Sequence, residues 1–199
     1  MNTDIFTIGH STHEIGTFMK LLTDNSIDLI CDVRSSPYSQ YNPQFNREVL
    51  KKSLQENEIK YHFMGFELGG RTNNPAHLKD GRVQYQKIAE TEKFNGGLKK
   101  LIHLAEKHTV AIMCSEKDPL TCHRAILVGR QLQHQNFNVY HILDSGEIED
   151  KNQFEDHLLE ALNIPKQLDM FQSVEDIIER AYDTQGQKVA YVMKEDKDE

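Results

Sequence analysis

The sequence predicts an α/β fold, a doubly wound (Rossmann-like) parallel sheet of about five strands with helices on both faces, followed by a short C-terminal extension. Two observations predict it. Five short apolar runs alternate with segments of helical periodicity between residues 5 and 162. The run over 27–33 is nearly continuous, as in a parallel strand covered on both faces. Because the crossovers between such strands must be right-handed, the alternation implies a parallel sheet.

The first part of the chain alternates strand, helix and strand. Residues 5–8 are a short β-rich run, and residues 12–23 place apolar side chains on one face of a helix. Asn25 and Ser26 end that helix, and the strand 27–33 follows. Residues 35–43 form an irregular loop longer than most connections, and such loops are often functional.

The middle of the chain continues the alternation. We expect a helix over 45–54, a strand over 59–64 and an exposed loop over 73–80. Residues 83–108 have helical periodicity, which the turn-forming residues 95–97 are expected to interrupt.

The last part of the domain repeats the unit of strand and helix. A fourth strand ends at Cys114, a fifth covers 138–143, and a helix covers 154–162. The helix after the fourth strand has a buried face formed by Ala125, Ile126, Val128 and Leu132. We therefore expect a domain of residues 1–163 and an extension of residues 164–199.

Composition and charge exclude several classes of protein. Of the 199 residues, 38% are hydrophobic and 27% charged, as in soluble globular proteins. No apolar stretch approaches the roughly 20 residues that span a membrane, and the N-terminus does not resemble a secretory signal, so we expect a cytoplasmic protein. The three cysteines then predict reduced thiols. A net charge of −8 argues against non-specific coating of nucleic acid, since that binding depends on neutralising phosphates.

Polar side chains follow the strands at one edge of the expected sheet. In the commonest strand order, the first and fourth strands are neighbours at the switch point, where such folds bind ligands. This order brings together His10, Ser11, Asp32, Arg34, Cys114 and Glu116. Asp32 should either bond Arg34 or face the crevice, because a charge at a strand end needs a partner.

The helix after the fourth strand is expected to carry Cys122, His123 and Arg124 on its first turn. Free N–H groups at a helix start attract anions, and Arg124 would bind phosphate or carboxylate with two hydrogen bonds. Arg34 and Arg71, which follow the second and third strands, would complete an anion site near this helix start. The alternative is structural, because a buried cysteine is common as a small hydrophobe and Asp118-Pro119 is an ordinary helix start.

Two loops hold further candidates for substrate binding. Gly69 and Gly70 would let the backbone approach a ligand closely, and Arg71 adds a cation. The ring of Tyr38 would stack on a ligand or cover the sheet edge.

Four groups of residues carry a resemblance to a known family. They are Thr7-Ile8-Gly9-His10-Ser11, Asp32-Val33-Arg34 with Pro37 and Ser39, Leu68-Gly69-Gly70, and Cys114-x-Glu116 with Cys122-His123-Arg124. The combination resembles the bacterial domain-of-unknown-function 488 family over residues 4 to about 162. The resemblance implies an α/β domain with an active site in the crevice described above, and it does not imply an established reaction.

The extension contains a second resemblance, in Gln167-Leu168-Asp169-Met170-Phe171. This segment resembles the peptide by which bacterial replication and repair proteins bind the DNA sliding clamp, with Met170 in place of the usual Leu. It follows Pro165 and precedes a capping-box helix start at Ser173-x-x-Asp176, as an exposed linker would. The alternative is a linker that packs its apolar side chains on the domain.

The first functional hypothesis is an enzyme, a hydrolase or transferase, that acts on a phosphate-bearing nucleotide or nucleic-acid component. Its expected catalytic residues are Cys114, Glu116, Cys122, His123, His10 and Asp32, and its expected substrate-binding residues are Ser11, Arg34, Tyr38, Gly69, Gly70, Arg71 and Arg124. Cys114 or Cys122 would be the nucleophile, because a nearby cation or helix start lowers a thiol pKa. His10 or His123 would be the base. In a second version, Asp32 or Glu116 activates water without a covalent step.

Two other hypotheses compete with a thiol or carboxylate enzyme. Zinc could bind Cys114, Cys122, His123 and His10, but the spacing matches no common zinc motif and adjacent side chains at 122 and 123 would diverge on a helix. We therefore predict no cofactor, with zinc as the weaker alternative. The third hypothesis is a non-enzymatic module that binds a nucleotide or serves repair or replication as an adaptor at the clamp.

Overall fold

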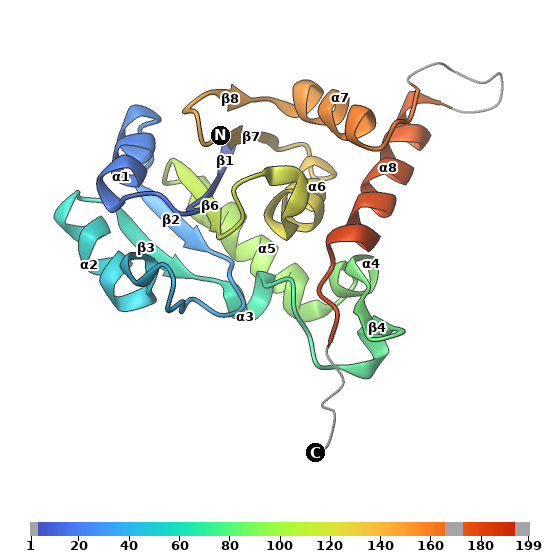
Figure 1. Cartoon of the computed structure of the whole chain (residues 1–199), viewed down its shortest axis with the longest axis horizontal. Coiled ribbons are helices and arrows are strands. Elements are labelled where there is room, and N and C mark those ends of the chain that lie inside the picture. The colour runs from blue at the N-terminus through green and yellow to red at the C-terminus, as the bar shows by residue number, and fades with distance from the viewer. Residues whose placement is uncertain (1–3, 166–172, 194–199) are drawn as a thin grey trace.

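The fold is built around a six-stranded sheet with the strand order β3-β2-β6-β1-β7-β8 (Figure 1). The structure is a computed structural model, and it describes residues 4–165 and 173–193. The strands of this sheet are β1 (Asp4–Gly9), β2 (Leu29–Asp32), β3 (Lys60–Phe63), β6 (Val110–Cys114), β7 (Asn138–Ile142) and β8 (Ile148–Glu149). The first five are the predicted parallel strands, and β8 adds an antiparallel edge. The predicted doubly wound α/β fold is confirmed.

Helices surround the sheet. They are α1 (Ile15–Asp24), α2 (Arg47–Glu56), α3 (Gly65–Leu68), α4 (Tyr85–Ala89), α5 (Glu92–Ala105), α6 (Arg130–Gln133), α7 (Lys151–Ala161) and α8 (Val174–Val189). Shorter elements are the 3-10 turns η1 (Pro43–Phe45), η2 (Pro75–His77) and η3 (Pro119–Thr121), the π-helical segment η4 (Arg124–Gly129), and a hairpin of β4 (Leu78–Lys79) and β5 (Arg82–Val83). No helix in the described part of the chain has the length and apolar character needed to cross a membrane.

The two faces of the sheet pack on different helices. Because side chains alternate along a strand, Ile112 and Cys114 of β6 join a core with α5 and η4, whereas Ala111 and Met113 join a core with α1 and α2. Every residue of β2 and β6 is buried, as expected for central parallel strands. The side chain of Cys114 therefore lies on the same side of the sheet as η4.

The register brings three strand ends together. Gly9 of β1 pairs with Cys114, and Asp32 of β2 pairs with Met113. The expected contact between the first and fourth predicted strands is thus confirmed. The loops that follow β1, β2 and β6 consequently start side by side.

The predicted helix break at residues 95–97 is wrong. Helix α5 runs through these residues without interruption, and it begins where the hydroxyl of Thr91 accepts a hydrogen bond from the backbone of Phe94. A Cβ at Gly97 would lie 2.6 Å from the Cβ of Glu67, so the glycine allows α5 to pack closely on the segment that contains α3. The expected loop at 73–80 also holds more structure than predicted, since it includes η2 and β4.

The helix of the expected C-terminal extension packs against the domain. Its start at Ser173 has the predicted capping box with Asp176. Tyr182 of α8 is buried with Phe154 of α7, and Arg130 of α6 forms ion pairs with two carboxylates of α8. Figure 1 shows α8 running from α7 towards α4 and the β4 hairpin, where Val192 bridges to Arg82. The clamp-like segment 167–171 lies outside the described residues.

Candidate functional site

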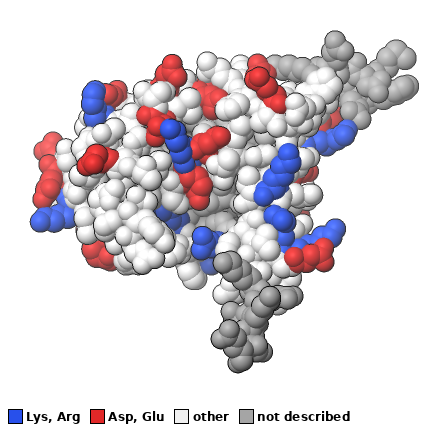
Figure 2. Space-filling view, viewed as in Figure 1, with Lys and Arg blue, Asp and Glu red and all other residues white. Residues whose placement is uncertain are grey.

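A cavity of about 150 Å³ lies where the loops after β2 and β6 meet. The residues of its wall that the sequence had indicated are Arg34, Gly70, Arg71, Cys114, Glu116 and His123. The wall also includes Ser35, Ser36, Tyr85, Val189 and Tyr191, which the sequence had not indicated. Cys114 is buried, whereas Arg71 is exposed, so the cavity connects a buried thiol to an accessible cation. Charges of both signs are interspersed on the face in Figure 2, without a continuous basic strip among the described residues.

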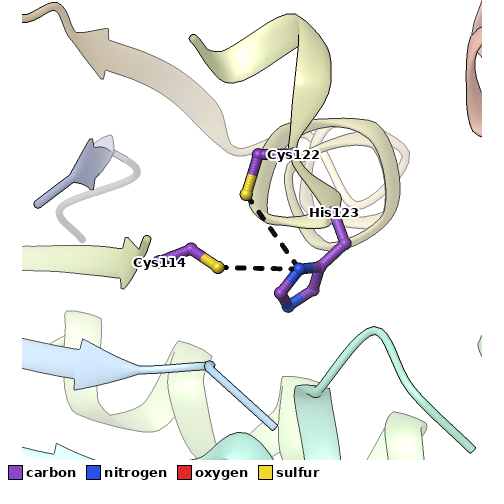
Figure 3. Close-up of side chains that lie close together, drawn as sticks. All are labelled: Cys114, Cys122 and His123. Atoms are coloured by element: carbon purple, nitrogen blue, oxygen red, sulfur yellow. Dashed lines mark hydrogen bonds between the residues drawn. The ribbon is translucent and has the colours of Figure 1, made fainter. Parts of the chain in front are cut away.

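Four side chains converge beside this cavity. The Oε2 atom of Glu116 lies 2.9 Å from the Sγ of Cys114 and 3.0 Å from the Sγ of Cys122. The Nδ1 atom of His123 lies 3.7 Å from the first sulfur and 4.0 Å from the second (Figure 3). The two sulfurs and the ring nitrogen all lie within 4.8 Å of one another. The arrangement therefore offers two thiols, an imidazole and a carboxylate around one point.

The backbone between Asp118 and His123 explains this convergence. Asp118 caps the turn η3 by accepting a hydrogen bond of 2.7 Å from the backbone of Leu120. Cys122 then has extended backbone angles, φ −129° and ψ 136°, and only His123 enters the helical region. The expectation that both residues lie on the first turn of a helix, with diverging side chains, is therefore wrong. Because the backbone of Cys122 is extended and that of His123 is helical, the two side chains point towards the same centre.

The ring of His123 is held from two sides. Its Nε2 atom lies 3.1 Å from the carbonyl oxygen of Val33, so this nitrogen carries a hydrogen and donates it. A Cβ at Gly70 would lie 2.7 Å from the Cγ of His123, so a larger residue would displace the ring. Gly70 thus makes room for a protein side chain, a role that differs from the expected approach of a ligand to its backbone. Gly69 likewise packs closely, since its Cβ would lie 2.5 Å from the Oγ of Ser35.

The electrostatics of the two thiols differ. Burial, followed by the neighbouring Cys122 and Glu116, raises the pKa of Cys114 well above its usual value. Burial also opposes ionisation of Cys122, but hydrogen bonding from Cys114 and the charges of Arg124 and His123 lower its pKa well below that value. The backbone N–H of Arg124 also donates to the sulfur of Cys122 over 3.4 Å. Cys114, whose pKa is raised, lines the cavity, whereas Cys122, whose pKa is lowered, does not.

His10, Asp32 and Arg34 form a separate, buried cluster. The guanidinium of Arg34 donates to both carboxylate oxygens of Asp32, at 2.9 and 2.7 Å, and Tyr61 donates to one of them at 2.7 Å. Asp32 thus bonds Arg34, the first of the two expected alternatives. Because it is fully buried and its oxygens are engaged, a catalytic role for Asp32 finds no support in this geometry.

The imidazole of His10 is also engaged. Its Nε2 accepts a hydrogen bond of 3.1 Å from Arg34, and its Nδ1 donates to the carbonyl of Ser11 over 2.9 Å. Burial and then the charge of Arg34 lower the pKa of His10 to about 4. The lone pair that a general base needs is consequently occupied. The backbone N–H of Ser11 bonds the carbonyl of Ser115, which fixes the loop after β1 against the loop after β6.

The predicted role of Arg124 in an anion site at the helix start is wrong. The side chain of Arg124 is fully buried and donates to the carbonyls of Glu116 and Lys117, at 2.6 and 3.0 Å. All of η4 is buried, so Arg124 holds the loop after β6 in place and does not reach the cavity. Tyr38 is exposed, donates to Glu48 and does not line the cavity. Of the three expected arginines, Arg34 and Arg71 line the cavity.

Two aromatic residues complete the site from distant parts of the chain. The guanidinium of Arg71 lies over the ring of Tyr191, with 4.7 Å between its Cζ and the ring centroid. The backbone N–H of Val83 donates a hydrogen bond to the carbonyl oxygen of Tyr191, which fixes the position of Tyr191. Tyr85 lies two residues after Val83 in the sequence. No local sequence signal marks these residues, because only the packing of α8 on the domain brings Tyr191 to the cavity. Ser35 and Ser36 belong to the long loop that the sequence had marked as functional.

Comparison with known protein families gives one match. A model of the family described as "Domain of unknown function DUF488" matches residues 14–131, more than half of the 199 residues. The matched stretch includes Arg34, Gly70 and all four converging side chains, and it ends before α7 and α8. No curated protein and no solved structure matches the chain.

Proposed function

The chain belongs to the DUF488 family, and we propose that it is an enzyme, a hydrolase or transferase, that acts on a phosphate-bearing nucleotide or nucleic-acid component. The observation that carries the proposal is the cavity that Arg71 shares with Cys114, Glu116 and His123. A guanidinium can bind phosphate with two parallel hydrogen bonds, and the other three side chains are of the types that transfer protons or attack a substrate.

The size and lining of the cavity favour binding of one reacting group. Pockets that enclose a whole small molecule usually measure roughly 300–1,000 Å³, and this cavity measures about 150 Å³. It therefore suits a phosphate and its immediate neighbours, with the rest of the substrate extending past Arg71 into solvent. Hydroxyl groups of Ser35 and Ser36 can bond phosphate oxygens, and the ring of Tyr85 can stack on a base.

Hydrolysis is the reaction that the placement of Glu116 favours. Glu116 lines the cavity, and its carboxylate can take a proton from a water molecule that attacks the substrate. Cys114 lines the same wall and would attack directly in the covalent version. The carboxylate version is favoured because Glu116 is an exposed residue of the cavity wall, whereas both thiols are buried.

A binding and turnover assay on the full chain tests the proposal. The substrates are nucleoside mono-, di- and triphosphates and short oligonucleotides, with products followed by mass spectrometry. Loss of a charge-assisted hydrogen bond of about 1.5–3 kcal/mol should raise KM roughly 10- to 100-fold in Arg71→Ala. Removal of a general base should lower kcat about 10²- to 10⁴-fold in Glu116→Gln. Unchanged turnover in both Cys114→Ser and Cys122→Ser would exclude the thiol version.

Arg47→Ala is the matched control for Arg71→Ala. Arg47 also lies over an aromatic ring, with 4.6 Å to the centroid of Phe63, but it does not line the cavity. The proposal predicts that Arg47→Ala behaves like the wild type. Equal effects of the two substitutions, or no binding of any phosphate compound by the wild type, would contradict it.

Docking on the DNA sliding clamp is a second candidate function, for an adaptor or for the enzyme itself. The observation that favours it is the pattern Gln167-Leu168-Asp169-Met170-Phe171, followed by a helix that starts at Ser173 with a capping box. Such docking would connect the protein to repair or replication. It would also concentrate an acidic protein on DNA without a basic surface.

A further inference from the structure

We propose that Cys114, Cys122 and His123 bind a zinc ion, with the fourth position of the ion next to the Glu116 carboxylate. The two sulfurs and the Nδ1 atom of His123 lie within 4.8 Å of one another, and they come from β6 and from the short segment after η3. Figure 3 shows the three side chains pointing towards one another. A pair of thiols and an imidazole around one point is a donor set that zinc favours.

The distances are close to those of a tetrahedral zinc site. With Zn–S of about 2.3 Å and Zn–N of about 2.0 Å, tetrahedral angles place a sulfur and a nitrogen ligand about 3.5 Å apart. The observed distances from the His123 nitrogen are 3.7 Å to Cys114 and 4.0 Å to Cys122. Movements of a few tenths of an ångström would thus bring the His123 nitrogen to the distance that it would have from each sulfur in a zinc site.

The surroundings of the ligands are also those of a metal site. A zinc-binding histidine usually donates its other ring N–H to a carbonyl or carboxylate, and His123 donates its Nε2 hydrogen to the carbonyl of Val33. This bond leaves Nδ1 directed at the sulfurs. The backbone N–H of Arg124 donates to the sulfur of Cys122, and Gly70 packs against the ring. The three donor atoms are therefore held in position by the fold.

The unusual sequence spacing follows from the turn between the ligands. The extended backbone at Cys122 returns the chain to β6 and aims adjacent side chains at one centre. Among common metals, zinc is favoured by a tetrahedral set of sulfur and imidazole ligands. Binding forms two Zn–S bonds, each proton still carried by a sulfur passes to the solvent, and no oxidation state changes.

The zinc site would add a catalytic metal to the proposed function. Only this catalytic role rests on the proposed function, and the binding of zinc does not. Three protein ligands and an open position are typical of catalytic zinc, which activates a bound water. Glu116 lines the cavity and lies within hydrogen-bond distance of both sulfurs, so its carboxylate would lie beside that water. The ion would supply the nucleophile, and Arg71 would hold the phosphate.

Metal analysis of the full chain, purified with a reductant and without chelators, tests the inference. We expect about one zinc ion per chain. Replacement by Co²⁺ should produce sulfur-to-cobalt charge transfer and the visible bands of a tetrahedral site. In competition with a chromophoric chelator, Cys114→Ser, Cys122→Ser and His123→Gln should each lower zinc affinity at least about 100-fold, since each removes a ligand. Cys31→Ala is the matched control, because Cys31 is equally buried but lies outside the cluster.

The outcomes separate this inference from the proposed function. The zinc site is overturned if the wild type takes up no zinc, shows no sulfur-to-cobalt band, or holds another metal tightly. It is also overturned if Cys114→Ser and Cys31→Ala bind zinc with equal affinity. Because the cobalt spectrum is measured on the wild type, the test holds even if a variant does not fold. Binding of inorganic phosphate that depends on Arg71 without zinc uptake would retain the proposed function alone. Zinc uptake without phosphate binding would retain the zinc site alone.

Discussion

The Nε2 atom of His123 lies 3.1 Å from the carbonyl oxygen of Val33, the residue that directly follows strand β2. This contact joins the loop after β2 to the segment after η3, and it determines which ring nitrogen carries the hydrogen. Because a carbonyl only accepts, Nε2 must donate, and Nδ1 is left facing the two sulfurs. The proposed zinc site and the proposed catalytic cavity both depend on this orientation.

The first prediction concerns the tautomer of His123. Long-range nitrogen–proton NMR spectra of the full chain should show a hydrogen on Nε2 at neutral pH, both without metal and with zinc. Addition of zinc should move the resonance of Nδ1 and leave the hydrogen on Nε2. His134, whose Nε2 lies 2.9 Å from a surface carboxylate, is a useful reference on the same chain. A spectrum in which Nε2 of His123 lacks a hydrogen would contradict the orientation.

The second prediction tests the space that Gly70 leaves for this ring. In Gly70→Ala the new Cβ would lie 2.7 Å from the Cγ of His123, so the ring must move. Overpacking of this kind costs about 1–3 kcal/mol, and we expect zinc affinity to fall at least about 10-fold, as when a supporting contact is lost. Chemical unfolding and chelator competition measure the two effects.

Gly96→Ala is the control for Gly70→Ala. A Cβ at Gly96 would meet nothing within 4 Å, and the residue lies within helix α5. Alanine there should stabilise the protein by about 0.5–1 kcal/mol through helix propensity and should leave zinc affinity unchanged. A loss of zinc affinity in both variants would show that Gly70 has no special relation to the ring.

The central sheet was predictable because long-range and local signals agree there. The continuous apolar run that became β2 is buried on both faces, and the polar residues that end β1, β2 and β6 meet as the switch-point rule requires. Short elements were not predictable, since the two-residue strand β8 exists only because β7 offers an edge. Gly97 was misinterpreted because its use is tertiary, in the packing of α5 near α3.

Residue types predicted the candidate site better than spacing did. Cys114, Glu116, Cys122 and His123 were selected for their chemistry, and they lie together. Arg124 was misassigned because nothing in the sequence distinguishes an arginine that bonds backbone carbonyls from one that binds a ligand. Tyr191 was missed because it reaches the cavity only through the packing of α8.

The third prediction concerns Tyr191, on which Arg71 stacks. Tyr191→Ala removes the ring that positions the guanidinium, and a cation–π contact at an exposed site contributes about 0.5–1 kcal/mol. We therefore expect affinity for inorganic phosphate to fall roughly 2- to 5-fold, as measured by calorimetry. Tyr191→Phe keeps the ring and should bind like the wild type. The prediction fails if both variants lose the same affinity, because the hydroxyl would then be the important group.

The fourth prediction is a loss of stability in acid caused by His10. Burial and the charge of Arg34 lower its pKa from 6.5 to about 4, so between these values the unfolded chain binds a proton that the folded chain does not. The contribution of His10 to stability is therefore complete above pH 6.5 and falls towards pH 4, by up to about 1.4 kcal/mol per pH unit. Urea unfolding at pH 7 and pH 5 should show a smaller difference for His10→Gln than for the wild type. An equal difference in the two proteins would contradict the prediction.

The fifth prediction is that residues 167–171 bind the DNA sliding clamp of the same organism. Five residues contribute little area, so apolar anchors in pockets must offset the entropy lost on ordering, and Leu168, Met170 and Phe171 are the apolar residues of the segment. We expect an affinity near micromolar, about −8 kcal/mol. Titration of the full chain with the clamp should show that Gln167→Ala and Phe171→Ala each weaken binding at least about 10-fold, as expected for interface anchors.

The control for the clamp titration is Tyr41→Ala, which removes an aromatic side chain that is 84% exposed and lies far from the segment in sequence. It should bind the clamp like the wild type, because truncation of an exposed ring outside an interface leaves the anchors in place. The two candidate functions can then be judged independently, since Arg71→Ala should retain clamp binding and Phe171→Ala should retain the phosphate site. Absence of binding by the wild type, or equal binding by the wild type, Gln167→Ala and Phe171→Ala, would refute clamp docking.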